Sequence, residues 1–218
     1  MKLEPTSLRY IAIEGVLGAG KTTLATMLAQ RLNAQLVLEH FEDNPFLVSF
    51  YQDPERFAFQ TQLFFLLSRF KQQQTYSQMD LFQSCIVTDY VFERDRIFAT
   101  VTLNESELKL YDQVAQVVER SVPQPDLIVY LQSSVERLEH NIHLRGRTME
   151  AQVTQTYLGA LNREYNNFFF RFSEAPVLIV NAAEIDFEHN EEQFEELVHE
   201  ITRPRTAQIQ YYLPMQRP

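Results

Sequence analysis

The stretch Gly15-Val16-Leu17-Gly18-Ala19-Gly20-Lys21-Thr22 matches the pattern G-x-x-x-x-G-K-[ST]. Residues 10–14 just before it are typical of a short buried strand, and residues 22–32 just after it carry apolar side chains at helical spacing. A strand, a glycine-rich turn and a helix in this order form a phosphate-binding loop, because backbone N–H groups and the helix N-terminus converge on phosphate oxygens. We therefore expect the chain to bind a nucleoside triphosphate here.

The residue types in this loop suit distinct tasks. Lys21 is expected to reach the outer phosphates, and the Thr22 hydroxyl to help hold Mg²⁺. A glycine-rich turn that binds nothing is disfavoured, because eight residues match in the right strand–turn–helix setting. The expected nucleotide-binding residues are Gly15, Gly18, Gly20, Lys21, Thr22 and Thr23.

The composition favours one compact α/β domain, spanning 1–218, with an aromatic core. The 218 residues are 45% hydrophobic and include 17 Phe and 10 Tyr but no Trp. A formal net charge of −10 argues against nucleic acid and anionic membranes as partners, since both attract Lys and Arg. With Cys85 as the only cysteine, and with no evident signal peptide or membrane-spanning run, we expect a cytoplasmic protein.

Strand and helix patterns alternate along the chain, which predicts a doubly wound, mostly parallel sheet of five strands. The strands are expected at about 9–14, 34–39, 84–89, 126–131 and 177–180. The helices are expected at about 20–33, 54–77, 92–100, 105–121, 133–144, 151–172 and 190–201, with a short one opening at Asn44-Pro45. The 54–77 helix is apolar almost all round in its middle, so we expect it to be buried. The tail from Arg203 is not assigned to an element.

Two carboxylates stand at strand ends, Glu39 after the second strand and Asp89 after the third. Ligands of doubly wound sheets bind beyond the carboxyl ends of the strands, so we expect both residues close to the bound triphosphate. Phosphoryl transfer needs a metal ion and often a base for the acceptor hydroxyl, and these carboxylates are the candidates for base and metal partner. The alternative for either one alone is a solvated strand end or a helix N-cap.

Two further pairs leave alternatives open on pattern alone. Arg145 and Arg147 either clamp phosphates from a lid or belong to an ordinary helix C-terminus ending in Arg-Gly. Gln62 and Arg69 are seven residues apart and lie on one face of the long helix. A Gln amide offers a donor and an acceptor to a nucleobase edge. A Gln bonded to a neighbouring carbonyl and an Arg reaching solvent explain the pattern equally well.

From the first strand to about Phe187 the sequence resembles the deoxynucleoside kinase family. Four blocks carry the resemblance: the phosphate loop and residues 39–47, 51–69 and 144–150. The resemblance implies that Mg²⁺-ATP donates its γ-phosphoryl group to the 5′-hydroxyl of a deoxynucleoside. It also implies a homodimer formed through helical faces.

The resemblance further implies roles for individual side chains. Glu39 corresponds to the general base, and Asp89 either holds Mg²⁺ with Thr22 or serves as the base itself. The lid block favours phosphate clamping by Arg145 and Arg147. The remaining implied contacts are Tyr51 and Glu150 with the sugar, Gln62, Arg69 and Asp95 with the nucleobase, and Asp186 and Phe187 with the adenine of ATP. Phe98 is a candidate stacking ring, for which simple core packing is the alternative.

The segment Asp89-Tyr90-Val91 departs from the family, which usually has Asp/Glu-Arg-Ser at this point. The Arg that would steady the reacting 5′-oxygen and phosphates is missing. Arg94 follows about one helical turn later, and we hypothesise that it supplies this charge. Asn141 likewise replaces a basic residue common in the family lid, which predicts a weaker clamp.

The expected substrate is a purine deoxynucleoside or deoxycytidine, because family members with the Arg69–Asp95 pair favour these bases over thymine. One alternative is a nucleoside monophosphate kinase of the thymidylate kinase type. It would need extra positive charge for the acceptor's phosphate, and the missing Arg after Asp89 counts against it. Another is a non-catalytic nucleotide-binding relative, which the intact phosphate loop and Glu39 disfavour.

Overall fold

The computed structural model describes residues 8–74, 85–119, 122–205 and 207–212, and its centre is one parallel sheet. The strand order is β2-β3-β1-β4-β5-β6, and every neighbouring pair is parallel. The order runs in opposite directions on the two sides of β1, as in a doubly wound sheet. The strands are β1 (Tyr10–Gly15), β2 (Gln35–Val37), β3 (Ile86–Thr88), β4 (Leu127–Gln132), β5 (Val177–Asn181) and β6 (Ile209–Tyr212).

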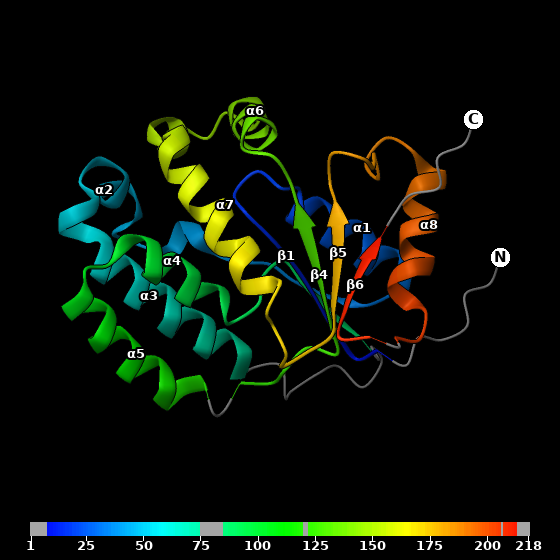
Figure 1. Cartoon of the computed structure of the whole chain (residues 1–218), viewed down its shortest axis with the longest axis horizontal. Coiled ribbons are helices and arrows are strands. Elements are labelled where there is room, and N and C mark those ends of the chain that lie inside the picture. Colours follow the sequence, from blue (N-terminus) through cyan, green and yellow to red (C-terminus); the bar gives the residue numbers. More distant parts are fainter. Residues whose placement is uncertain (1–7, 75–84, 120–121, 206, 213–218) are drawn as a thin grey trace.

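Helices cover the sheet and extend well beyond one side of it. The second to fifth helices gather with α7 on one side of the strands, whereas α8 lies on the other (Figure 1). The α-helices are α1 (Lys21–Leu32), α2 (Leu47–Gln52), α3 (Pro54–Gln74), α4 (Arg94–Thr102), α5 (Glu105–Glu119), α6 (Val135–Arg145), α7 (Gln155–Phe169) and α8 (Glu191–Thr202). Short 3₁₀ turns occupy Phe41–Asp43 and Thr148–Gln152.

The four central strands of the sheet are buried on both faces. All residues of β1 and β3 are buried, and β4 and β5 are buried up to their last residue, without the alternation seen in half-exposed sheets. Aromatic rings fill the space between the sheet and α7: Tyr130 of β4 stacks on Phe169 with ring centroids 4.7 Å apart. Tyr165 lies one turn earlier on α7, with its centroid 6.3 Å from that of Tyr130. The expectation of an aromatic core is confirmed.

The prediction of five strands is wrong by one, because the unassigned tail forms β6. Its Ile209 pairs with Val177 and its Tyr212 with Val180, so β6 extends the sheet beyond β5. A four-residue strand in a polar segment with three prolines has too short an alternation to be seen as a pattern. The expected positions 75–77, 84 and 120–121 lie outside the described residues.

The long helix α3 is less buried than its composition predicts. Leu67 is 46% exposed, while Gln62, Arg69 and Gln73 are buried. The apolar side chains are spread around the helix, whereas these polar ones face inward. An inward polar face on a helix indicates a cavity beside it rather than a packed core. In the part of the chain that the structure describes, no helix combines the length and apolarity needed to cross a membrane.

Candidate active site

The phosphate loop connects β1 to α1 and depends on glycine at two positions. Gly18 has φ 84°, and a Cβ atom there would lie 2.6 Å from the carbonyl oxygen of Leu138. Gly20 precedes α1 with φ 94°. L-residues rarely adopt these angles, and a side chain at Gly18 would also collide with α6, so both positions need glycine. The loop leads directly into the N-terminus of α1, where phosphate oxygens are expected to bind.

Lys21 lies within this loop rather than extending into solvent. Its Nζ donates to the carbonyl oxygens of Gly15 at 2.8 Å and Val16 at 3.2 Å. Burial, and after it the nearby Arg94, lower the pKa of Lys21 to about 8 against the opposing effect of neighbouring carboxylates. The ammonium is therefore held where phosphates would bind, with a proton that it loses more easily than an exposed lysine does.

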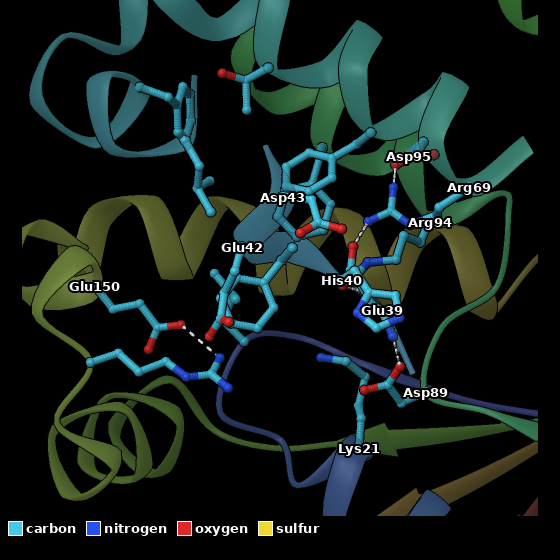
Figure 2. Close-up of a pocket in the computed structure, with 18 of the residues that line it drawn as sticks. Lys21, Glu39, His40, Glu42, Asp43, Arg69, Asp89, Arg94, Asp95 and Glu150 are labelled. Carbon is cyan, nitrogen blue, oxygen red and sulfur yellow. Dashed lines mark hydrogen bonds and ion pairs between the residues drawn. The ribbon is translucent and has the colours of Figure 1, made fainter. Parts of the chain in front are cut away.

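The ends of β2 and β3 meet at the loop, as expected for a doubly wound sheet. The Thr22 hydroxyl donates to Asp89 Oδ2 at 2.6 Å, and the Glu39 backbone N–H donates to Asp89 Oδ1 at 2.8 Å. Asp89 thus connects the first turn of α1 to Glu39, the other carboxylate at a strand end. Lys21, Glu39 and Asp89 lie at one end of the cavity in Figure 2.

Two arginines hold the Glu39 carboxylate. Arg94 Nη1 donates to Glu39 Oε2 at 2.7 Å, and Arg69 donates to Glu39 Oε1 while also pairing with Asp95 (Figure 2). Burial alone would raise the pKa of Glu39, but Arg69, Arg94 and Lys21 outweigh it and hold that pKa at about 2. The cation hypothesised from sequence at Arg94 therefore lies directly against the candidate base.

A cavity of about 300 Å³ opens beside these ion pairs. Gln62 is 2% exposed and lines this cavity. Phe98 also lines it, edge-on to Tyr165, with the Arg94 guanidinium 5.2 Å from its ring centroid. The sequence-predicted residues on this wall are Tyr51, Gln62, Arg69, Arg94, Asp95, Phe98 and Glu150.

The end of α6 and the segment after it form another part of the cavity wall. Arg145 donates to both oxygens of Glu150, at 2.7 and 2.6 Å, and Arg147 lies 3.6 Å from the same carboxylate. The Arg147 guanidinium also lies 4.2 Å from the ring centroid of Phe41. Burial raises the pKa of Tyr51, which shares this wall of the cavity. The two arginines therefore face the cavity instead of only ending a helix.

A second, more open cavity lies on the other side of the phosphate loop and includes Asn141, Asp186 and Phe187 in its wall. Phe187 is buried beneath the loop, 3.3 Å from where a Cβ on Gly20 would lie. Asp186 is bonded to His189 in an exposed turn. Asn141 donates to the Gly18 carbonyl at 2.8 Å. Asn141, which stands where the family lid usually has a basic residue, thus connects α6 to the phosphate loop.

Sequence reasoning missed Glu14 and Thr61. Glu14 is fully buried, accepts the N–H groups of Gly15 at 2.9 Å and Val91 at 3.0 Å, and so fixes the start of the loop against the end of β3. A carboxylate inside an apolar strand is a signal that could have identified it. Thr61 lines the cavity and is fully buried, with no hydrogen-bond partner for its hydroxyl among the described residues. Its position next to Gln62 was the only sequence signal.

Thr22 and Asp89 fit a magnesium ion that is bound mainly by substrate phosphates. Mg²⁺ usually takes one or two protein oxygens and completes its shell with phosphates and water. The hydroxyl of Thr22 and the carboxylate of Asp89 supply two such oxygens 2.6 Å apart. No cluster of three or more His, Cys, Asp or Glu suited to a metal ion occurs in the described ranges.

A phosphate loop at the switch point of a parallel sheet, beside a cavity lined by strand-end carboxylates, defines a P-loop NTPase fold. The deoxynucleoside kinase family model matches residues 11–204, and the chain belongs to this family. Deoxyguanosine kinase of Bacillus subtilis (strain 168) is 36% identical over 197 residues, 88% of this chain and 95% of that protein. Deoxyadenosine/deoxycytidine kinase of the same organism is 32% identical over 198 residues, 88% and 90% of the two chains.

Solved structures agree with this assignment. Deoxyadenosine kinase from M. mycoides with bound dCTP superposes with a TM-score of 0.76 at 26% identity, covering 88% of this chain and 97% of that one. The same enzyme with bound dATP gives a TM-score of 0.78, covering 89% and 100%. The chain is thus a kinase that phosphorylates nucleosides, as the sequence predicts. Family membership counts against both the monophosphate kinase and the non-catalytic alternatives.

Proposed function

We propose that this kinase transfers the γ-phosphoryl group of Mg²⁺-ATP to the 5′-hydroxyl of a purine deoxynucleoside or deoxycytidine. The observation that carries the proposal is the position of Glu39. Its backbone is bonded to Asp89, which is bonded to Thr22 at the phosphate loop, while its carboxylate lines the cavity. A hydroxyl group held there would lie between a carboxylate and the phosphates, as in-line transfer requires.

The cavity wall supplies donors and acceptors for a nucleoside. Gln62 lines the cavity with an amide that can both donate and accept, and Asp95 is held by Arg69 so that its carboxylate can accept from an exocyclic amine. Adenine, guanine and cytosine carry such an amine, and thymine does not. At the other end, Tyr51 and Glu150 are assigned to the 3′-hydroxyl, where the lid segment reaches the cavity.

In the proposed mechanism the 5′-hydroxyl proton passes to Glu39, with Asp89 as the alternative base. A pKa of about 2 makes Glu39 a weak base while both arginines hold it. A hydroxyl that takes the place of one guanidinium bond would raise this pKa towards its ordinary value. Arg94 then remains beside the reacting oxygen and replaces the positive charge that the family usually has after the strand-three carboxylate.

Lys21, Arg145 and Arg147 are assigned to the charge that develops on the transferring phosphoryl group. Lys21 is fixed by the loop carbonyls, whereas the two lid arginines are paired with Glu150 and are partly exposed. Bound Mg²⁺ would neutralise further phosphate charge, held by Thr22 and Asp89. Asp186 and Phe187 are assigned to the adenine of ATP, from the cavity on the outer side of the loop.

The proposal includes a homodimer in the cytoplasm. The exposed large apolar side chains of α3 and α5 are Leu67, Leu110 and Val117, and these two helices pack side by side (Figure 1). Burying them against a second copy would remove apolar area from water. Cys85 is free and buried, which suits a reducing compartment. Sedimentation of wild type and Val117→Glu tests this part, with a monomeric wild type as the contradicting result.

A phosphorylation assay across deoxyadenosine, deoxyguanosine, deoxycytidine and thymidine tests the main proposal. We expect Mg²⁺-dependent formation of a 5′-monophosphate from at least one of the first three, and the lowest turnover with thymidine. Deoxyadenosine monophosphate and thymidylate serve as acceptor controls. Preferred transfer to either monophosphate, or ATP binding without transfer to any nucleoside, would contradict the proposal.

A further inference from the structure

Tyr90, the residue after Asp89, connects the end of β3 to the segment that carries Glu39. Its side chain is fully buried, and its hydroxyl donates to Gln72 Oε1 at 2.7 Å. Gln72 lies on α3, and its Nε2 donates to the carbonyl oxygen of Leu38 at 3.0 Å. Leu38 directly precedes Glu39. Two side-chain hydrogen bonds in series therefore reach from β3, through α3, to the residue before the proposed base.

The Glu39 segment needs such support because the sheet does not supply it. The ladder between β2 and β3 ends where Val37 pairs with Thr88, two residues before Glu39. Beyond that point two side-chain contacts hold the backbone: Asp89 accepts the Glu39 N–H, and Gln72 donates to Leu38. These contacts replace the missing ladder hydrogen bonds at residues 38–39, whose backbone position determines where the Glu39 carboxylate lies.

The ring of Tyr90 supports the same carboxylate from a second direction. The Arg69 guanidinium carbon lies 5.7 Å from the Tyr90 ring centroid, within the range of cation–π attraction. Arg69 in turn pairs with both Glu39 and Asp95. Tyr90 is not among the described residues that line the cavity, so any effect on a substrate must pass through its neighbours.

We propose that Tyr90 is a positioning residue for the proposed base: it fixes the Glu39 backbone through Gln72 and the Glu39 carboxylate through Arg69. This inference rests on the proposed function, in which Glu39 takes the proton. Position 90 then has a structural task in this chain, while Arg94 supplies the cation. A displaced carboxylate slows the transfer step more than it weakens nucleoside binding, because proton transfer depends steeply on geometry.

Tyr90→Phe tests this directly, since it removes one oxygen and keeps the ring. We expect kcat to fall about tenfold, the factor that corresponds to one net buried hydrogen bond, with nucleoside KM changed by less than about twofold. Gln72→Met should give a similar loss. Tyr111→Phe is the matched control, because Tyr111 is also fully buried but its hydroxyl has no hydrogen-bond partner among the described residues. A loss in Tyr111→Phe equal to that in Tyr90→Phe would overturn the inference.

The same change in a Glu39→Gln background separates positioning from general packing. If Tyr90 acts through Glu39, adding Tyr90→Phe lowers the residual turnover by less than about twofold, because coupled residues are not additive. An undiminished tenfold loss in the double variant would mean that Tyr90 acts elsewhere.

Hydrogen exchange of the Glu39 amide provides a readout that needs no turnover. Tyr90→Phe is expected to speed this exchange by about threefold or more, and Tyr111→Phe to leave it unchanged, since the Gln72 contact stabilises segment 38–39 locally. Equal exchange in wild type and Tyr90→Phe would overturn the inference. A wild-type chain that phosphorylates no deoxynucleoside would instead overturn the proposed function, and the exchange result would still decide the position of Glu39.

Discussion

The two sides of the site are built in different ways. The phosphate side is built mainly from backbone, namely glycines with positive φ and the N-terminus of α1. Its one charged side chain, Lys21, is hydrogen-bonded to the loop carbonyls. The side that we propose for the nucleoside is formed by side chains from α2, α3 and α4, with Glu39, Arg69, Arg94 and Asp95 joined by ion pairs. The first side is contiguous in sequence and fixed by local geometry. The second depends on contacts between residues far apart in sequence, such as Glu39 and Arg94, which are 55 positions apart.

The largest expected effect is on the phosphate side. Lys21→Met keeps the length of the side chain and removes the only charge that the loop itself provides, so we expect kcat/KM for ATP to fall by about 10³-fold or more. Nucleoside binding, measured by calorimetry without ATP, should change little because Lys21 is anchored in the loop. A loss below about tenfold would show that the two sides are less separate than the geometry indicates.

On the nucleoside side, Glu39→Gln should lower kcat by about 10²- to 10³-fold, the contribution typical of a general base. Asp89→Asn is the comparison, because Asp89 holds both Thr22 and the Glu39 backbone. Raised Mg²⁺ is expected to restore part of the activity of Asp89→Asn but none of that of Glu39→Gln. If raised Mg²⁺ instead restored activity to Glu39→Gln and not to Asp89→Asn, Glu39 would be the metal partner and Asp89 the base.

Arg94→Ala tests whether Arg94 supplies the positive charge that the family usually has directly after the strand-three carboxylate. We expect kcat to fall about 10²-fold, because one positive group near the reacting oxygen is removed. Arg96→Ala is the matched control, two residues along the same helix, since Arg96 is largely exposed and pairs with Asp112. Turnover of Arg94→Ala within a few-fold of wild type would rule the assignment out. Equal losses in both variants would indicate a general effect on α4.

The sequence was sufficient for the parts of the molecule that are local. The loop, the parallel sheet and the strand-end carboxylates could be predicted because each depends on a short pattern or on strand order. The ion pair between Glu39 and Arg94 could only be hypothesised, since it depends on how α4 packs against the end of β2. Strand β6 was missed, and α3 was expected to be buried all round although Leu67 is 46% exposed, because both depend on tertiary contacts and not on periodicity.

The pH dependence should also differ between the two sides. Lys21 has a pKa lowered to about 8, so kcat/KM for ATP is expected to fall as pH rises through 8, by about tenfold at pH 9. The pKa of Glu39 is lowered to about 2, so this carboxylate stays ionised in the free enzyme down to that pH. Its contribution to stability is complete above its ordinary pKa and is lost as pH falls through 2. Lys21→Arg should abolish this fall in kcat/KM at high pH. A fall that persists unchanged in Lys21→Arg would be due to the titration of another group.

The smallest expected effect concerns specificity. The Thr61 hydroxyl is buried in the nucleoside cavity beside Gln62 and has no hydrogen-bond partner in the described part of the chain, so a nucleobase or a bound water must satisfy it. Thr61→Val keeps the shape and removes this group. We expect the ratio of kcat/KM values between deoxyguanosine and deoxyadenosine to change by about three- to tenfold, because the two bases differ in their edge groups. Thr100→Val, at an exposed hydroxyl bonded to Arg96, is the control. An unchanged ratio in Thr61→Val would mean that Thr61 does not select the base. Selection would then depend on the Gln62 amide and on the Arg69–Asp95 ion pair.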